Sequence, residues 1–177
     1  MRIPKSLFIL FLLLCFGGGP CFAKELEGRH FEKEGGFSYQ PPKGWKIKEV
    51  PGMKYKFVFG PPIDRFSPNM NFVDEAFSGG LDHYVDLNVK ALHSNFKGFE
   101  KFNQTTFKTA AGQTGIKLTT QAEQNGRRIR QTYYFFELSK EKKLVVTCSA
   151  SAKDGEAFDK VFEETLETLL LANKDVL

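Results

Sequence analysis

The chain is poor in the residues that most often perform catalysis or bind metal ions. Its 177 residues include three histidines and three cysteines, so few side chains titrate near neutral pH. The sequence contains no Gly-x-Ser-x-Gly elbow, no His-Glu-x-x-His pair, no phosphate-binding glycine loop and no Cys-x-x-Cys pair. We therefore expect a protein that is not an enzyme, with no catalytic residues, no metal ligands and no cofactor.

Long hydrophobic runs are also scarce. The longest, Leu7–Phe16, has ten residues, whereas a helix needs about 20 apolar residues to span a bilayer. Arg2 and Lys5 precede this run, and small residues at Cys21 and Ala23 suit a signal peptidase. We expect residues 1–23 to be a signal peptide, and the mature protein to be periplasmic or extracellular without stable membrane insertion.

A lipid anchor is the alternative, because cysteines occur near the end of the apolar run. A lipoprotein signal needs a small residue directly before the cysteine, but Pro20 precedes Cys21 and Leu14 precedes Cys15. The sequence therefore favours a soluble exported form over an anchored one. Cys148 would then be alone in the mature chain, so no intramolecular disulfide can form. We expect it to be a small buried hydrophobic residue.

Charge of one sign is not concentrated in the mature chain. Cleavage after Ala23 leaves 154 residues with 23 basic and 21 acidic side chains, a net charge of +2. A nucleic-acid partner would require a concentrated basic face, so we expect none. A chain of 154 residues is long enough for one domain with a substantial core.

The C-terminal part has the clearest structural pattern. Apolar and polar residues alternate from Gly115 to Glu123, and Asn125-Gly126 favours a type I′ hairpin turn. Two more apolar strands follow, near residues 128–138 and 144–150. A closing amphipathic helix is predicted by apolar residues at helical spacing, with Asp159 and Glu163 on its solvent side. Its apolar stripe is Phe158, Val161, Phe162, Leu166, Leu169 and Leu170.

The N-terminal part predicts a sheet interrupted by one helix. Residues 24–36 are mostly charged and contain three glycines, so we expect a flexible arm. Short strands are predicted to begin at Phe37, Trp45, Tyr55 and Met70, with Trp45 and Ile47 pointing into the core. A helix over residues 81–96 and a strand over 99–107 follow. The prediction is an α+β domain over residues 37–172, with an antiparallel sheet of about six to eight strands and a helix on each face.

The segment Phe37-Ser38-Tyr39-x-Pro41-Pro42-x-Gly44-Trp45, together with this order of elements, resembles the PsbP/Mog1-like family. The resemblance covers residues 37–171 and implies an α/β/α sandwich around an antiparallel sheet. Family members include extrinsic subunits of photosystem II, a small-GTPase-binding transport protein and bacterial adaptors. The resemblance therefore implies binding or assembly without catalytic turnover. It identifies no binding residues in this chain.

One group of side chains has the composition of a metal site. Asp82, His83 and Asp86 lie within one turn of the predicted first helix, and His93 follows. Carboxylates and imidazoles at this spacing can bind a divalent cation. Lys90 falls on the same stripe and would repel the cation, so we favour a solvated polar face.

Two further groups of charges have structural interpretations. Asp64, Asp74 and Glu75 flank the fourth strand, but the adjacent Asp74 and Glu75 should point to opposite faces of the sheet. Basic residues also gather at two hairpin turns, at opposite ends of one strand. We expect solvated charges that protect the sheet edges rather than an acid-binding patch. These residues are Arg127, Arg128, Arg130, Lys140, Lys142 and Lys143.

The sequence thus favours a non-enzymatic binding or assembly accessory protein outside the cytoplasm, with a protein partner in the cell envelope. The alternative is a carrier of a small apolar ligand in the envelope, suggested by the 19 phenylalanines. Core packing is the simpler explanation for those side chains. A hydrolase with no recognisable motif is the third hypothesis.

Overall fold

The computed structural model describes residues 28–172, so the predicted signal peptide and residues 24–27 lie outside the described part of the chain. The helices are α2 (Leu81–Asn95) and α3 (Gly155–Glu167). The strands are β1 (His30–Glu32), β2 (Phe37–Tyr39), β3 (Lys46–Lys48), β4 (Phe57–Phe59), β5 (Asn69–Ala76), β6 (Glu100–Lys108), β7 (Thr114–Gln124), β8 (Arg127–Ser139), β9 (Lys142–Ser151) and β10 (Leu170–Leu171).

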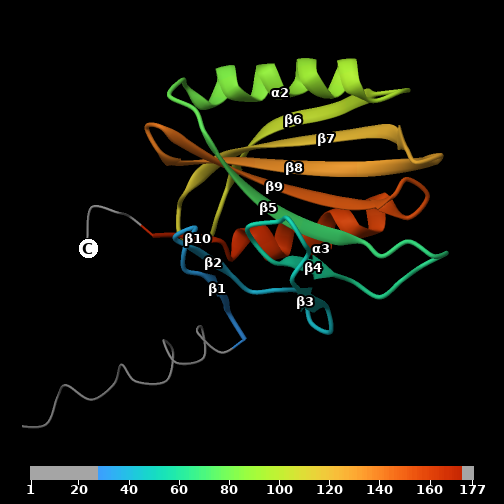
Figure 1. Ribbon diagram of the computed structural model, residues 1–177, viewed down its shortest axis with the longest axis horizontal. Coiled ribbons are helices and arrows are strands. Elements are labelled where there is room, and N and C mark those ends of the chain that lie inside the picture. The colour runs from blue at the N-terminus through green and yellow to red at the C-terminus, as the bar shows by residue number, and fades with distance from the viewer. Residues whose placement is uncertain (1–27, 173–177) are drawn as a thin grey trace, which may run out of the picture.

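Seven strands form one antiparallel sheet in the order β3-β4-β5-β9-β8-β7-β6. The two helices lie on opposite faces of this sheet and are offset from each other. In Figure 1, α2 runs along the top, near β6, whereas α3 lies lower, by β9 and β5. This arrangement confirms the predicted α+β architecture with a helix on each face.

The β7–β8 hairpin is formed as its turn residues predict. Asn125 and Gly126 both have positive φ, 49° and 72°, which a type I′ turn requires at both central positions. Ten cross-strand pairs follow from the turn, from Gln124↔Arg127 to Gly115↔Phe136. The register places Tyr133 and Phe135 on the α2 face and Tyr134 and Phe136 on the α3 face.

The main core lies between the sheet and α3. Phe162 and Leu166 of the helix are buried against aromatic residues of the strands, including Phe72, Tyr134 and Phe136. The apolar stripe predicted for this helix is wrong at its C-terminal end, because the helix stops at Glu167. Leu170 instead lies in β10 and is 39% exposed. Trp45 is half-buried and packs edge-on against Phe158 and Phe162, at centroid distances of 6.1 and 5.9 Å.

A second, three-stranded sheet joins the two ends of the described chain. Its order is β1-β2-β10, with Ser38 paired to both Phe31 and Leu170. Gln113 fixes β10 from the side, since its amide accepts a hydrogen bond from the Leu171 N–H and donates one to the Leu171 carbonyl. The prediction of a flexible arm is therefore wrong for residues 30–32. These residues form a strand whose backbone groups pair with Phe37–Tyr39.

Candidate functional site

The residues that resembled a metal site do not converge. Asp82, His83 and Asp86 are exposed on α2. The His83 ring packs 5.8 Å from the ring of Phe77, and the His93 ring packs 5.8 Å from that of Phe99, at the other end of the helix. Within residues 28–172, no three histidine, cysteine or acidic side chains lie together as metal ligands. These imidazoles contribute ring packing at the two ends of α2.

Asp74 and Glu75 point to opposite faces of β5, as predicted. The Asp74 carboxylate accepts hydrogen bonds from Lys54 and Lys142, each at 2.9 Å, and its side chain is 7% exposed. Burial alone would raise the pKa of this carboxyl, but the two ammonium groups outweigh it and lower the pKa to about 2. Asp64 is separate, paired with Lys153 at 3.5 Å. The three carboxylates form no paired acid–base site.

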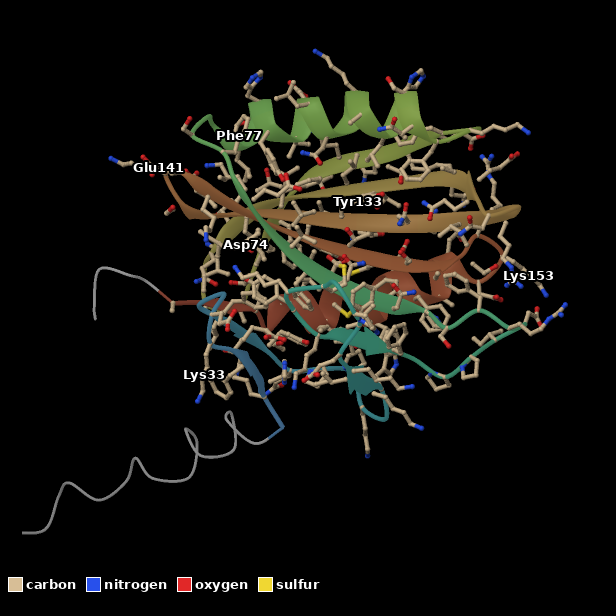
Figure 2. All side chains as sticks on the ribbon, viewed as in Figure 1. Lys33, Asp74, Phe77, Tyr133, Glu141 and Lys153 are labelled. Carbon is tan, nitrogen blue, oxygen red and sulfur yellow. The ribbon has the colours of Figure 1, made fainter. Side chains whose placement is uncertain are left out.

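Glu75 belongs to a charged row beneath the start of α2. Cross-strand pairing aligns Glu75 with Lys143, and Lys143 with Glu137. The Lys143 side chain is 0% exposed and its ammonium group donates to Glu137 at 3.1 Å, so its predicted solvation is wrong. The Tyr84 hydroxyl donates to Glu75, and Phe77 lies beside this row near Glu141 (Figure 2). Lys143 is thus paired with Glu137, and the Glu75 carboxylate accepts a hydrogen bond from Tyr84.

The prediction of a solvated position is also wrong for Arg130 and Asp159. Arg130 reaches the α3 face, where its guanidinium donates to the Asp159 carboxylate at 2.6 Å. Their side chains are 13% and 24% exposed. Gly155 permits this contact, since a Cβ there would lie 2.4 Å from the Arg130 Cδ. The ion pair fixes the first turn of α3 to β8.

A network of uncharged polar side chains occupies the α2 face where β8 and β9 pass beyond the helix. Gln131 accepts hydrogen bonds from Gln124 at 2.6 Å and from the Tyr133 hydroxyl at 2.7 Å. It donates to Ser149 at 3.1 Å. The network is satisfied internally, which stabilises the sheet surface. Sequence reasoning did not identify it, because the Gln131–Ser149 contact depends on strand pairing.

Burial dominates the ionisation of the aromatic and thiol groups. It raises the pKa of all five tyrosines: Tyr39, Tyr55, Tyr84, Tyr133 and Tyr134. It also raises the pKa of the Cys148 thiol, which is 0% exposed, so the expected buried, unreactive cysteine is confirmed. These phenols and this thiol therefore stay protonated near neutral pH, and none of them can act as a nucleophile or base there.

An open hollow lies between the C-terminal half of α2 and the start of β6. It has a volume of about 530 Å³ and is open to solvent. We call it the β6 groove; it is lined by Val89, Lys90, His93, Ser94, Phe99 and Lys101. A second open hollow, of about 360 Å³, lies at the β3–β4 turn around Met53 and Tyr55.

The β6 groove borders the free edge of the large sheet. β6 is the last strand in the sheet order and pairs only with β7 among the described strands. Its register shifts between Lys101 and Asn103, and the intervening Phe102 is 51% exposed. Bulges and lysines often protect such edges from pairing. Residues 103–108 beyond the bulge are nevertheless a regular, largely exposed edge.

Comparison with known proteins identifies the architecture. No family model and no curated protein matches the sequence. Three similar solved structures are LpqN of Mycobacterium tuberculosis, cyanobacterial PsbP (CyanoP) of Synechocystis and Mog1p of Saccharomyces cerevisiae. Their TM-scores are 0.60, 0.56 and 0.55, and their identities 12%, 14% and 11%. The matches cover 77%, 81% and 83% of this chain and 83%, 91% and 96% of those chains. The chain has the PsbP/Mog1-like fold.

In this PsbP/Mog1-like fold, most side chains that could perform chemistry are bound to one another. The β6 groove and the edge beside it were not predicted as a site. Their signal in the sequence is weak, because Val89 and Phe99 resemble core residues and Lys90 and Lys101 resemble ordinary surface charges. No helix within residues 28–172 has both the length and the apolar composition needed to cross a bilayer.

Proposed function

We propose that the protein is a non-enzymatic accessory that binds another protein outside the cytoplasm. The observation that supports this most directly is an open sheet edge beside a solvent-accessible groove. Surfaces of this kind can accept a segment of another chain. The least exposed charged side chains of the described residues are engaged in internal ion pairs, as at Asp74 and Lys143.

Proteins of the same fold support a binding role. Mog1p is a Ran-binding protein, and LpqN is involved in cell envelope biogenesis. At 11% and 12% identity these similarities concern the fold. We transfer from them only the general class of role, a binding partner and an envelope context. The N-terminal sequence of basic residues, apolar run and Ala23 supports the same compartment.

The proposed processing has a direct test. Mass spectrometry of the protein recovered from outside the cytoplasm should find Lys24 at the N-terminus. Substitution of Ala23 by a bulky residue should make the unprocessed form accumulate. A diacylated Cys21 would instead show a lipid-anchored protein and overturn the proposed soluble form.

The binding role is tested by cross-linking in the native envelope fraction. A tagged wild-type chain should be cross-linked to the same protein in independent preparations, and the tagged partner should recover this chain in return. If the chain is recovered free under conditions that preserve known envelope complexes, the proposed function is wrong. The apolar-ligand carrier is less well supported, because the buried phenylalanines of residues 28–172 pack within the two cores.

A further inference from the structure

We infer that the β6 edge and the β6 groove together bind an extended, acidic segment of a partner protein. The inference deepens the proposed function and rests on it, because it specifies where the partner binds and which chemistry the partner presents. It depends on three observations: the unpaired edge of β6, the apolar floor of the groove and the charges at its rim.

The first observation concerns the backbone. Residues Asn103 to Lys108 pair with Thr119 to Thr114 on one side only, and the other side of β6 has no strand within residues 28–172. Backbone groups alternate in direction along a strand, so three of these six residues present their N–H and C=O groups to an added strand. The added strand would enlarge the sheet without displacing a described element. An extended segment is therefore the shape of ligand that this edge accepts.

The second observation concerns the groove beyond the Phe102 bulge. Val89 and Phe99 form an apolar surface between α2 and β6, and the His93 ring packs against Phe99. Side chains of an added strand alternate between the two faces of the sheet, about 7 Å apart on each face. Those on the α2 side would lie toward this surface. The groove therefore suits an apolar side chain near one end of the bound segment.

The third observation concerns charge. Lys90 and Lys101 stand at the rim of the groove, and neither has a carboxylate partner among the described ion pairs. The carboxylates of this region are already engaged, since Glu100 is bound by Arg128 at 2.7 Å and Glu123 by Lys97 at 3.2 Å. Lys101 contacts only the neutral amide of Gln104, at 2.6 Å. Two cations without counter-ions favour carboxylates on the incoming segment.

The test uses a synthetic peptide in which every second residue is threonine and the positions between are glutamate, valine and glutamate, so that the valine and both carboxylates lie on one face of the added strand. The peptide is added to isotope-labelled mature protein. We expect saturable NMR shift changes in β6 and in the last turns of α2. The double variant Lys90→Glu/Lys101→Glu should weaken binding by about tenfold or more, since two surface ion pairs are replaced by repulsions. Raising the salt concentration should weaken binding to the wild type.

Matched controls separate this site from general charge attraction. Lys43→Glu/Lys46→Glu makes the same charge change beside β3, at the opposite edge of the sheet, and should leave binding unchanged. A peptide N-methylated at alternate residues, on the edge that faces β6, should not bind, because its donors are blocked. Equal binding of the same peptide with lysines in place of its glutamates, shift changes elsewhere on the protein, or no binding would overturn the inference.

The same variants separate this inference from the proposed function. In the native cross-linking experiment, Lys90→Glu/Lys101→Glu should lose the partner, whereas Lys43→Glu/Lys46→Glu should retain it. If both variants retain the partner, the site is wrong while the binding function stands. If the wild type has no partner at all, the proposed function is wrong, and this inference is wrong with it.

Discussion

The two faces of the large sheet are built differently. On one face, α3 buries Phe162, Thr165 and Leu166 within a continuous aromatic core that also includes Tyr39 of the small sheet. On the other face, α2 buries only Tyr84 and Val85 fully, and its cluster includes fewer buried side chains. The difference indicates that the α3 face stabilises the domain. The α2 face, which includes the β6 groove, has more surface available for a partner.

The strongest test of this comparison removes α3. A chain that ends at Lys153 loses the helix and β10, and exposes the aromatic side chains of β8 and the aliphatic side chains of β9. We expect it to lose its cooperative thermal transition, because the lost burial is comparable to the net stability of a domain of this size. Circular dichroism during heating measures the outcome. A retained transition would show that α3 is a detachable element and that the comparison is wrong.

Alkaline pH tests both faces together. Burial raises the pKa of all five tyrosines, so the folded protein keeps phenolic protons that the unfolded chain releases above about pH 10. Stability from these groups is complete below that pH and is lost as the pH rises, by at most roughly 1.4 kcal/mol per pH unit for a fully buried tyrosine. Tyrosinate absorbance should therefore appear together with unfolding. Its appearance in a chain that is still folded would contradict the described burial.

Single truncations compare the two helices directly. Phe162→Ala should destabilise the domain by about 3–5 kcal/mol, since Phe162 is buried within the α3 core. Val85→Ala, a smaller truncation on α2 at a side chain that is 0% exposed, should cost about 2 kcal/mol. Urea titration measures both free energies of unfolding. Equal losses would mean that the two faces contribute alike.

Acid pH tests the ionic contacts at one end of the sheet. The Asp74 pKa is lowered to about 2 from an ordinary 3.8, so its contribution is complete above pH 3.8 and is lost as the pH falls toward 2. Between pH 5 and pH 2, the wild type should lose on the order of 1–2 kcal/mol more than Asp74→Asn. Asp64→Asn is the control, because that carboxylate is exposed. The same acid dependence in wild type and Asp74→Asn would show that Asp74 is not held by Lys54 and Lys142.

The smallest expected effect concerns the contact between α2 and Glu75. Tyr84→Phe removes the hydroxyl that donates to Glu75 and keeps the ring beside Phe77 and Phe135. We expect a loss of about 1 kcal/mol, the usual value for one hydrogen bond. Chemical denaturation measures it. A loss above about 3 kcal/mol would mean that α2 depends on this bond more than on its apolar contacts.

The sequence predicted the elements whose signals are local. The helices at 81–95 and 155–167 and the hairpin at Asn125-Gly126 follow from spacing and turn chemistry within a few residues. The short strands β1 and β10 were missed, because two or three residues give no periodic signal and their partner is distant in sequence. Leu170 was assigned to the wrong element for the same reason.

The environments of charged residues were the least predictable. Lys143 and Arg130 follow hairpin turns, where basic residues are usually solvated. Lys143 is buried between its neighbours on β5 and β8 and is paired with Glu137, and Arg130 is buried because α3 places Asp159 above β8. Both environments depend on how strands and helix pack, which the spacing of neighbouring residues does not reveal. The β6 groove was missed similarly, since it forms only where α2 passes the edge strand.

The small sheet also constrains the order in which the chain can fold. β2 lies near the start of the described residues and pairs with β10 at their end, while Gln113 holds β10 from the middle of the chain. A chain that emerges from its N-terminus cannot form this contact until its last strand is available. Pairings between such distant segments form slowly. We therefore expect the small sheet to close only after Leu170 and Leu171 have been synthesised, well after the β7–β8 hairpin can form.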